Sequence, residues 1–193
     1  MEVHLLLSLL LTVLVYGHRH HGHNDQHGHH EDHIGFYWDD YNENTIKHAV
    51  QGGKDTHDKI TYIGQAKHDC NGKQCVLPGI VYPDVNLMVY EWDKKPQRLN
   101  SNFKILCTHY PDHMKWIKTN TDDIKKLIHE KELIPGGIDE NLNKIYIGRV
   151  QTDGGLLVGK VITTDDAAGF YAVAHVGYVH ENNFEVLAHV MQH

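Results

Sequence analysis

The sequence predicts an all-β protein made of two pseudo-symmetric antiparallel β repeats, with one short helix between them and a disordered histidine-rich tail in front. Three observations lead to this fold class. One motif occurs twice, short runs of β-branched and aromatic residues alternate with glycine and asparagine, and a single segment has helical spacing. The 193 residues, 40% of them hydrophobic and 22% charged, are enough for a folded domain with a sizeable core.

The repeat is visible when the chain is aligned with itself at an offset of 84 residues. The first copy then matches the second at Gly52-Gly53 with Gly136-Gly137, Asp55 with Asp139, and Tyr62-Ile63-Gly64 with Tyr146-Ile147-Gly148. After four extra residues in the first copy, Leu77, Gly79 and Val81 match Leu157, Gly159 and Val161, and Phe103 and Leu106 match Phe184 and Leu187. We therefore expect a tandem β-repeat domain over residues 36–193, with copy one at about 49–107 and copy two at about 133–188.

Residues 1–17, MEVHLLLSLLLTVLVYG, have the features of a secretory signal peptide. The apolar run up to Tyr16 is broken only by Ser8 and Thr12, and Val15 and Gly17 stand where small residues precede cleavage. The alternative is a transmembrane anchor, but the run is shorter than the roughly 20 apolar residues that a span needs. We therefore expect a secreted, extracellular protein with no membrane span.

Residues 18–35 form a histidine-rich segment, which we expect to be disordered because residues 18–33 contain no aliphatic side chain. Imidazoles at this density can bind the divalent metal ions Cu, Ni or Zn, and they gain charge together below about pH 6.5. The candidate metal ligands are His18, His20, His21, His23, His27, His29, His30 and His33. Cleavage after Gly17 would also free the amine of His18 and place His20 third, which suits square-planar Cu(II) or Ni(II). The alternative is a solvated tail without a specific role.

In copy one, the runs ITYIG and VNLMVYEW predict strands. Cys70 and Cys75, separated by NGKQ, could close a small disulfide loop in an oxidising compartment. Cys107 is left over, and it follows the apolar Ile105-Leu106. A buried free thiol at Cys107 and its pairing with Cys70 or Cys75 both remain open.

Between the copies, TDDIKKLIHEK at residues 121–131 predicts a short amphipathic helix. Thr121 is the expected N-cap, and Ile124, Leu127 and Ile128 have helical spacing. We expect this apolar stripe to pack against the core. In copy two, NKIYIGRV and FYAVAHV predict further strands.

Composition and missing motifs argue against two function classes. The formal net charge is -7 with neutral histidine, and lysine and arginine do not cluster, so we expect no nucleic-acid partner. A G-x-S-x-G elbow, H-E-x-x-H, C-x-x-C and a dinucleotide-binding glycine fingerprint are all missing from the sequence. We therefore do not expect an enzyme.

Taken together, the repeated motifs resemble the DM-nine repeat family. Its units combine a Gly-Gly opening, a Tyr-(Ile/Val)-Gly-Arg strand, a Leu-Pro-Gly-Lys-Val strand and a closing (Tyr/Phe)-x-Val-Leu, and the match covers residues 49–106 and 133–187. The resemblance implies an all-β fold of two pseudo-symmetric repeats. It also implies a relationship to secreted mannose-binding lectins of invertebrate immunity and to uncharacterised secreted insect proteins.

The resemblance implies a sugar site in copy two. In the lectins of this family, an acidic residue after the Gly-Gly opening and the lysine of the Pro-Gly-Lys motif hold the sugar, and these positions are Asp139 and Lys160 here. Copy one keeps the acid as Asp55 but has Ile80 in place of the lysine, so we expect one working site per chain. In copy two, Val158 replaces the family's proline.

A carboxylate and an ammonium side by side can bind vicinal hydroxyls by charge-assisted hydrogen bonds. The rings of Tyr146, Trp38, Trp92 and Trp116 are candidates for stacking on a sugar, with core packing as the alternative. Calcium is not expected, because the chain has no clustered oxygen-ligand loop. We expect sugar binding by these residues to require no cofactor.

Two function classes follow. The first is a secreted carbohydrate-binding protein for mannose-type glycans on cell or microbial surfaces, with a role in innate immunity. With one site per chain, cross-linking of glycans would require a homodimer, a higher oligomer or the tail. The second is a secreted metal-binding or pH-responsive protein that uses the histidine-rich tail, with the repeat core as its scaffold.

Overall fold

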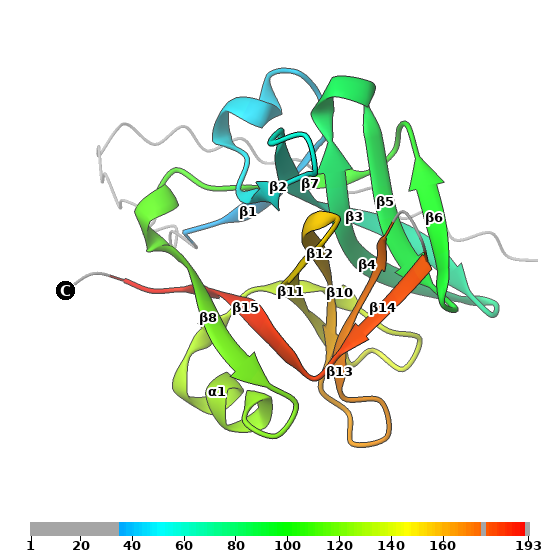
Figure 1. The fold of residues 1–193 in the computed structure, drawn as a ribbon, viewed down its shortest axis with the longest axis vertical. Helices are drawn as coiled ribbons and strands as arrows, with labels where there is room; N and C mark the ends of the chain where they lie inside the picture. Colours follow the sequence, from blue (N-terminus) through cyan, green and yellow to red (C-terminus); the bar gives the residue numbers. More distant parts are fainter. Residues whose placement is uncertain (1–34, 175–176, 192–193) are drawn as a thin grey trace, which may run out of the picture. The chain divides into compact units, whose positions relative to one another are not determined.

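The fold was obtained as a computed structural model, which describes residues 35–174 and 177–191 (Figure 1). The expected signal peptide and all eight candidate metal-binding histidines lie outside the described residues. Within the described ranges, no helix is both long and apolar enough to span a bilayer. The described residues form mostly antiparallel β-sheet with one α-helix, which confirms the predicted fold class.

We call residues 37–107 the first repeat and residues 111–189 the second repeat. The first repeat contains β1 (Tyr37–Asp40), η1 (Thr45–His48), β2 (Gln51–Lys54), β3 (Ile60–Cys70), β4 (Lys73–Tyr82), η2 (Pro83–Val85), β5 (Leu87–Trp92), β6 (Lys95–Leu99) and β7 (Lys104–Cys107). The second repeat contains η3 (Pro111–His113), β8 (Met114–Asn120), α1 (Ile124–Glu130), β9 (Glu132–Leu133), β10 (Pro135–Ile138), β11 (Lys144–Thr152), β12 (Gly155–Ile162), β13 (Gly169–Ala174), β14 (Gly177–Glu181) and β15 (Asn183–His189). The η elements are short 3₁₀ helices.

Both repeats have the same strand connections. In the first repeat the pairing order is β1, β7, β3, β4, β5 and β6, and in the second it is β8, β15, β11, β12, β13 and β14. The registers agree as well, because Gly64 pairs with Gly79 and Gly148 pairs with Gly159. The matched glycines of the sequence therefore occupy equivalent places in the two repeats.

The structural repeat begins earlier in the chain than the matched motifs. Trp38 of β1 pairs with Leu106, and Trp116 of β8 pairs with Leu187. Since the two leucines are equivalent, the two tryptophans are equivalent too. Sequence alignment missed this match because the connection that follows holds the short η1 in one repeat and the longer α1 in the other.

The two repeats interlock through their opening strands. Strand β10 of the second repeat pairs with β4 of the first at Ile138 and Val76, while Asp55 at the end of β2 forms a bridge with Gly155 of β12. A Cβ at Gly137 would collide with the backbone carbonyl of Val76, so this close approach requires glycine. Figure 1 shows the result, with β4, β10, β11 and β12 crossing near the centre of the fold.

Three groups of buried side chains form the core. One lies within the second repeat, another lies in the first repeat except for Ile145 of β11, and a third is shared by both repeats. The shared group includes Ile80, Leu106, Ile147 and Val158. Val158, which stands where the family has proline, is therefore a core residue at the junction of the repeats.

The helix is confirmed, but the predicted cap is wrong. Helix α1 begins at Ile124, and Asn120 Oδ1 accepts the backbone N–H groups of Asp122 and Asp123 in the turn before it. Thr121 instead donates its hydroxyl to the carbonyl of Asn182. The predicted apolar stripe does pack inward, since Ile124 is fully buried and its helical neighbours at i+3 and i+4 contact the same cluster.

The extra residues of copy one lengthen one hairpin. Strand β3 has 11 residues and β4 has 10, whereas β11 has 9 and β12 has 8. A disulfide joins Cys70 to Cys75 across the end of the longer hairpin. Cys107 is a buried free thiol whose Sγ lies 3.6 Å from the carbonyl oxygen of Thr45.

Candidate functional site

Lys160 lies at the contact between the two repeats. It belongs to β12, and its side chain is only 8% exposed. Its Nζ is 2.7 Å from Oε2 of Glu91 and 3.5 Å from the backbone oxygen of the same residue. Glu91 lies in β5 of the first repeat, so the two repeats together make this ion pair.

The other carboxylate oxygen of Glu91 is hydrogen-bonded to the backbone of the turn that follows β5. Its Oε1 accepts the backbone N–H of Lys94 at 2.6 Å, and its side chain is 4% exposed. Burying two charges is costly, but breaking such a pair costs about 3–5 kcal/mol because one charge is left without a partner. The pair therefore holds the ammonium of Lys160 in one position.

The ion pair lies beside a cavity of about 460 Å³, which we call the Lys160 cleft. It is lined by Asn71, Glu91, Trp92, Asp93, Lys94, Lys160, Ile162, Ala167, Tyr171 and Tyr178. The Nζ of Lys160 is 5.4 Å from the ring centroid of Trp92 and 6.0 Å from that of Tyr171. The cleft thus combines two cations, two carboxylates, a carboxamide and three aromatic rings.

The tyrosines of the cleft are fixed in place and neutral. Tyr171 donates its hydroxyl to the carbonyl of Ala167 at 2.7 Å, and its ring stacks on His180 at 4.5 Å between centroids. Burial raises the pKa of Tyr171 above its usual value, and the charges of Glu91 and Asp166 add to this effect. Burial likewise raises the pKa of Tyr178. Both phenols therefore carry their protons at neutral pH. Tyr171 donates its proton to Ala167, so of the two it is Tyr178 whose hydroxyl can donate to a ligand.

Asp139, the acid expected beside Lys160, has a different setting. Its Oδ1 accepts the backbone N–H groups of Asn141 and Asn143 at 2.8 Å, and its Oδ2 accepts the side-chain amide of Asn143 at 2.8 Å. It does not line the Lys160 cleft, and among the described residues no hydrogen bond or ion pair joins it to Lys160. Its carboxylate instead organises the turn between β10 and β11.

Asp55 forms the same turn in the first repeat. Its Oδ1 accepts the backbone N–H groups of His57 and Lys59 at 2.8 and 3.0 Å. The hydrogen bond from Lys59 is the main cause that lowers the pKa of this carboxyl. The acid that follows each Gly-Gly opening therefore has an evident structural role in both repeats.

Of the four aromatic candidates, only Trp92 lines the Lys160 cleft. Tyr146 is buried in the core of the second repeat, and Trp38 packs against the shared core. Trp116 lines a different cavity. Tyr171, Tyr178 and Glu91 were missed by sequence reasoning because they have no match in the other copy, although a charged residue inside the apolar run LMVYEW was an available signal.

A counterpart cleft of about 290 Å³ lies at the equivalent place around the first repeat. It is lined by Asp55, His57, Tyr82, Val85, Leu87, Val89, Pro96, Arg98, Gly154, Leu157, Val173 and Ala174. Ile80 is equivalent to Lys160, and since Lys160 pairs with Tyr171 and Ile80 pairs with Val89, Val89 is equivalent to Tyr171. Glu91 lies two residues after Val89, and Val173 lies two residues after Tyr171. Val173 therefore occupies the position that is equivalent to Glu91. The counterpart cleft thus has no ion pair at this position.

One group of potential metal ligands occurs within the described residues, at Cys70, Cys75 and Glu140. The two sulfur atoms already form a disulfide, so they are not thiolate ligands. The candidate copper, nickel or zinc ligands of the tail lie outside the described residues.

Comparisons with known proteins agree with the fold. The sequence model of the DM9 repeat matches residues 70–177, more than half of the chain. Solved structures that resemble the chain include the nematode sperm cell motility protein MFP2B, with a TM-score of 0.55, 12% identity and 81% of this chain covered. The chain spans 47% of the length of that protein. No curated protein matches the sequence.

Proposed function

Because the chain belongs to the DM9 repeat family, we propose that it is a carbohydrate-binding protein whose sugar site is the Lys160 cleft. The observation that carries this proposal is the buried pair of Lys160 and Glu91, 2.7 Å apart, at a cleft walled by Trp92, Tyr171 and Tyr178. Mannose-type glycans are the proposed ligands, as the resemblance to mannose-binding lectins implies. This assigns the acidic partner of the lysine to Glu91 in place of Asp139.

The roles of the cleft residues follow from their exposure. Oε2 of Glu91 is fully shielded from solvent, so Glu91 acts as a positioning residue that aims the ammonium of Lys160. Oε2 of Glu91 pairs with the ammonium by charge at 2.7 Å, whereas the hydrogen bond from Lys160 goes to the backbone oxygen of Glu91 at 3.5 Å. An ammonium has three donors, so Lys160 can also bind a sugar hydroxyl by a charge-assisted hydrogen bond.

The acceptors for the sugar come from the rim of the same cleft. Asp93 is exposed and offers a carboxylate, and Asn71 offers a carboxamide that can both donate and accept. Trp92 is half-buried and presents an apolar ring to the cleft, which suits the C–H face of a pyranose. The cleft thus provides both polar and apolar contacts for one sugar ring.

Retention on mannose resin, followed by titration calorimetry, tests this assignment. Replacing both charges, as Lys160→Gln with Glu91→Gln, removes the ammonium without leaving a lone buried charge, and we expect retention to be lost. Lys144→Ala, which removes an exposed lysine outside the cleft, should bind as the unaltered protein does. Normal retention by the double variant would exclude the Lys160 cleft as the sugar site.

The variant Asp139→Asn distinguishes the sugar site predicted from the sequence, which uses Asp139 with Lys160, from the Lys160 cleft, which uses Glu91 with Lys160. An asparagine oxygen can still accept the two backbone hydrogen bonds of the turn and gives up only the one from the Asn143 side chain, so we expect a folded protein that binds mannose. Loss of binding by folded Asp139→Asn, with binding retained by the double variant, would move the site to the turn between β10 and β11. If a glycan array finds no ligand even for the unaltered protein, carbohydrate binding itself is wrong.

We further propose that the protein is secreted and that its histidine-rich tail binds metal ions. The disulfide between Cys70 and Cys75 supports the first point, because such bonds persist in oxidising compartments. N-terminal sequencing of secreted protein should find His18 as the first residue.

If His18 is the first residue, the first Cu(II) ion should bind at the amine of His18 and at the imidazole of His20, and His20→Ala should weaken the binding of this first ion. Equal affinity in His20→Ala would leave only unspecific binding by the histidines.

A further inference from the structure

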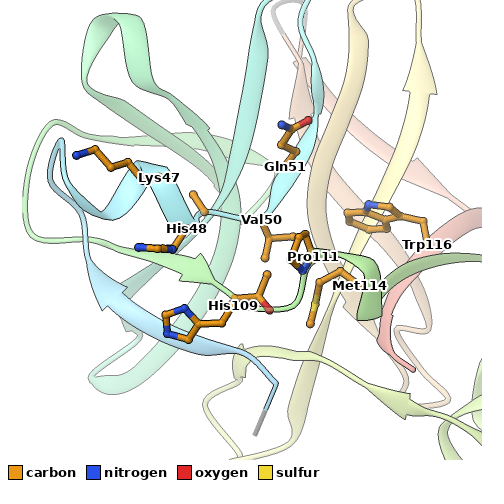
Figure 2. Close-up of a pocket in the computed structure, with 10 residues that line it drawn as sticks. Lys47, His48, Val50, Gln51, His109, Pro111, Met114 and Trp116 are labelled. Carbon is orange, nitrogen blue, oxygen red and sulfur yellow. The ribbon is translucent and has the colours of Figure 1, made fainter. Parts of the chain in front are cut away.

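Another cavity, of about 490 Å³ (Figure 2), is lined by residues other than those proposed to bind sugar. Its wall comes from both repeats, because η1 provides Lys47 and His48, the segment after β7 provides His109, and β8 provides Met114 and Trp116. None of these residues also lines the Lys160 cleft. The volume lies within the range of ordinary small-ligand sites.

One end of this cavity is basic. The rings of His48 and His109 lie 5.2 Å apart between centroids at an angle of 64°, and both residues are exposed. Figure 2 shows the two rings on the same side of the cavity, and the Lys47 side chain extending away from them. The lining contains no carboxylate, and within residues 35–174 and 177–191 Lys47 forms no ion pair.

The other end is apolar and rigid. Val50, Pro111 and Met114 lie between the histidines and Trp116, as Figure 2 shows. The guanidinium of Arg149 lies 4.2 Å from the ring centroid of Trp116, and its Nε is 2.6 Å from Oε2 of Glu185. Arg149 therefore supports the indole from outside the cavity while its own charge is paired.

We infer that this cavity binds a small anion built on an apolar ring, such as an aryl phosphate or aryl carboxylate. The acid group would accept hydrogen bonds from His48 and His109, and the exposed Lys47 side chain would turn towards the cavity to join them. Charge-assisted bonds of this kind are stronger than neutral ones. The ring would occupy the space along Met114 and Trp116, where it is removed from water. The site uses no residue of the proposed sugar cleft.

Titration of the full chain with three probes tests the inference. Phenyl phosphate carries both the charge and the ring, inorganic phosphate carries only the charge, and phenol carries only the ring. At pH 7.5 we expect phenyl phosphate to bind at least tenfold more tightly than either of the others. In ¹H–¹⁵N spectra, its shifts should be largest at residues lining the cavity.

Variants then localise the binding. Lys47→Ala with His48→Gln should weaken phenyl phosphate at least tenfold, and Trp116→Phe should weaken it less while keeping the fold. His129→Gln with Lys144→Ala is the matched control, because it removes one exposed histidine and one exposed lysine outside the cavity. Equal affinity for phenyl phosphate and inorganic phosphate, undiminished binding by the first variant, or no binding of phenyl phosphate at millimolar concentration would overturn the inference.

Discussion

The Lys160 cleft and its counterpart around the first repeat have the same backbone and different chemistry. Around Lys160 the equivalent positions hold Glu91, Trp92 and Tyr171, whereas around Ile80 they hold Val173, Ala174 and Val89. The duplicated glycines are kept because a side chain there would collide with the neighbouring strand, as a Cβ at Gly79 or Gly159 would. Duplication thus preserved the strand crossings, while the side chains lining the two clefts diverged.

The largest expected effect is the loss of the buried ion pair. Glu91→Ala leaves Lys160 without its carboxylate, and we expect the free energy of unfolding to fall by about 3–5 kcal/mol. Val173→Ala, at the equivalent position of the counterpart cleft, removes only apolar contacts and should cost less. Urea denaturation measures both. A cost for Glu91→Ala no larger than that for Val173→Ala would mean that the ion pair has no special role.

Placing lysine in the first repeat is the reverse experiment. Ile80 is 2% exposed within the shared core, so Ile80→Lys would bury an ammonium opposite Val173 and should cost several kcal/mol. Adding Val173→Glu should recover part of this loss. Calorimetry should still find one sugar per chain in the single variant. A second sugar bound by Ile80→Lys alone would show that the carboxylate partner is dispensable.

The β3–β4 hairpin of the first repeat contains a disulfide, whereas the equivalent β11–β12 hairpin of the second repeat contains no cysteine. Cys70→Ala with Cys75→Ala removes the disulfide of the longer hairpin, and we expect a loss of about 2 kcal/mol because the loop is short. Sugar binding should weaken only slightly, through Asn71, which lines the Lys160 cleft inside this loop. Reduction with dithiothreitol should reproduce the effect in the unaltered chain. Unchanged stability after reduction would contradict the prediction.

The smallest effect concerns Cys107, whose equivalent in the second repeat is Ala188. Burial, with a contribution from Asp39, raises the pKa of Cys107 from 9.0 to about 11. The folded chain therefore keeps the proton that the unfolded chain releases, and stability present below pH 9 is lost as the pH rises towards 11. Cys107→Ala should lower the free energy of unfolding by about 1 kcal/mol at pH 7. The variant should also lack the part of the alkaline loss of stability that the thiol of Cys107 causes. An identical pH dependence in the variant would show that other groups cause it.

Thiol labelling checks the same residue independently. At pH 8 native Cys107 should react with iodoacetamide far more slowly than the unfolded chain does, because it is buried and protonated. Rapid labelling of the native protein would mean that β7 opens readily.

The sequence by itself determined the features that depend on local pattern and on repetition. The strands, the helix after Asn120, the longer first hairpin and the difference between Lys160 and Ile80 could all be predicted, because strand alternation, helical spacing and matched glycines are visible in short stretches. The boundaries of the repeat could not. The equivalence of Trp38 and Trp116 is hidden by connections of different length, and pairing with Leu106 and Leu187 reveals it.

Only the tertiary structure decided which acid meets the lysine. Glu91 lies 69 residues from Lys160 and in the other repeat, so no local spacing relates them, and the contact exists because the repeats interlock around β4 and β12. Asp139, the nearer acid in sequence, is held by backbone N–H groups of its own turn. A carboxylate that accepts local hydrogen bonds can be predicted from its neighbours, whereas a carboxylate that pairs across an interface depends on how the whole chain packs.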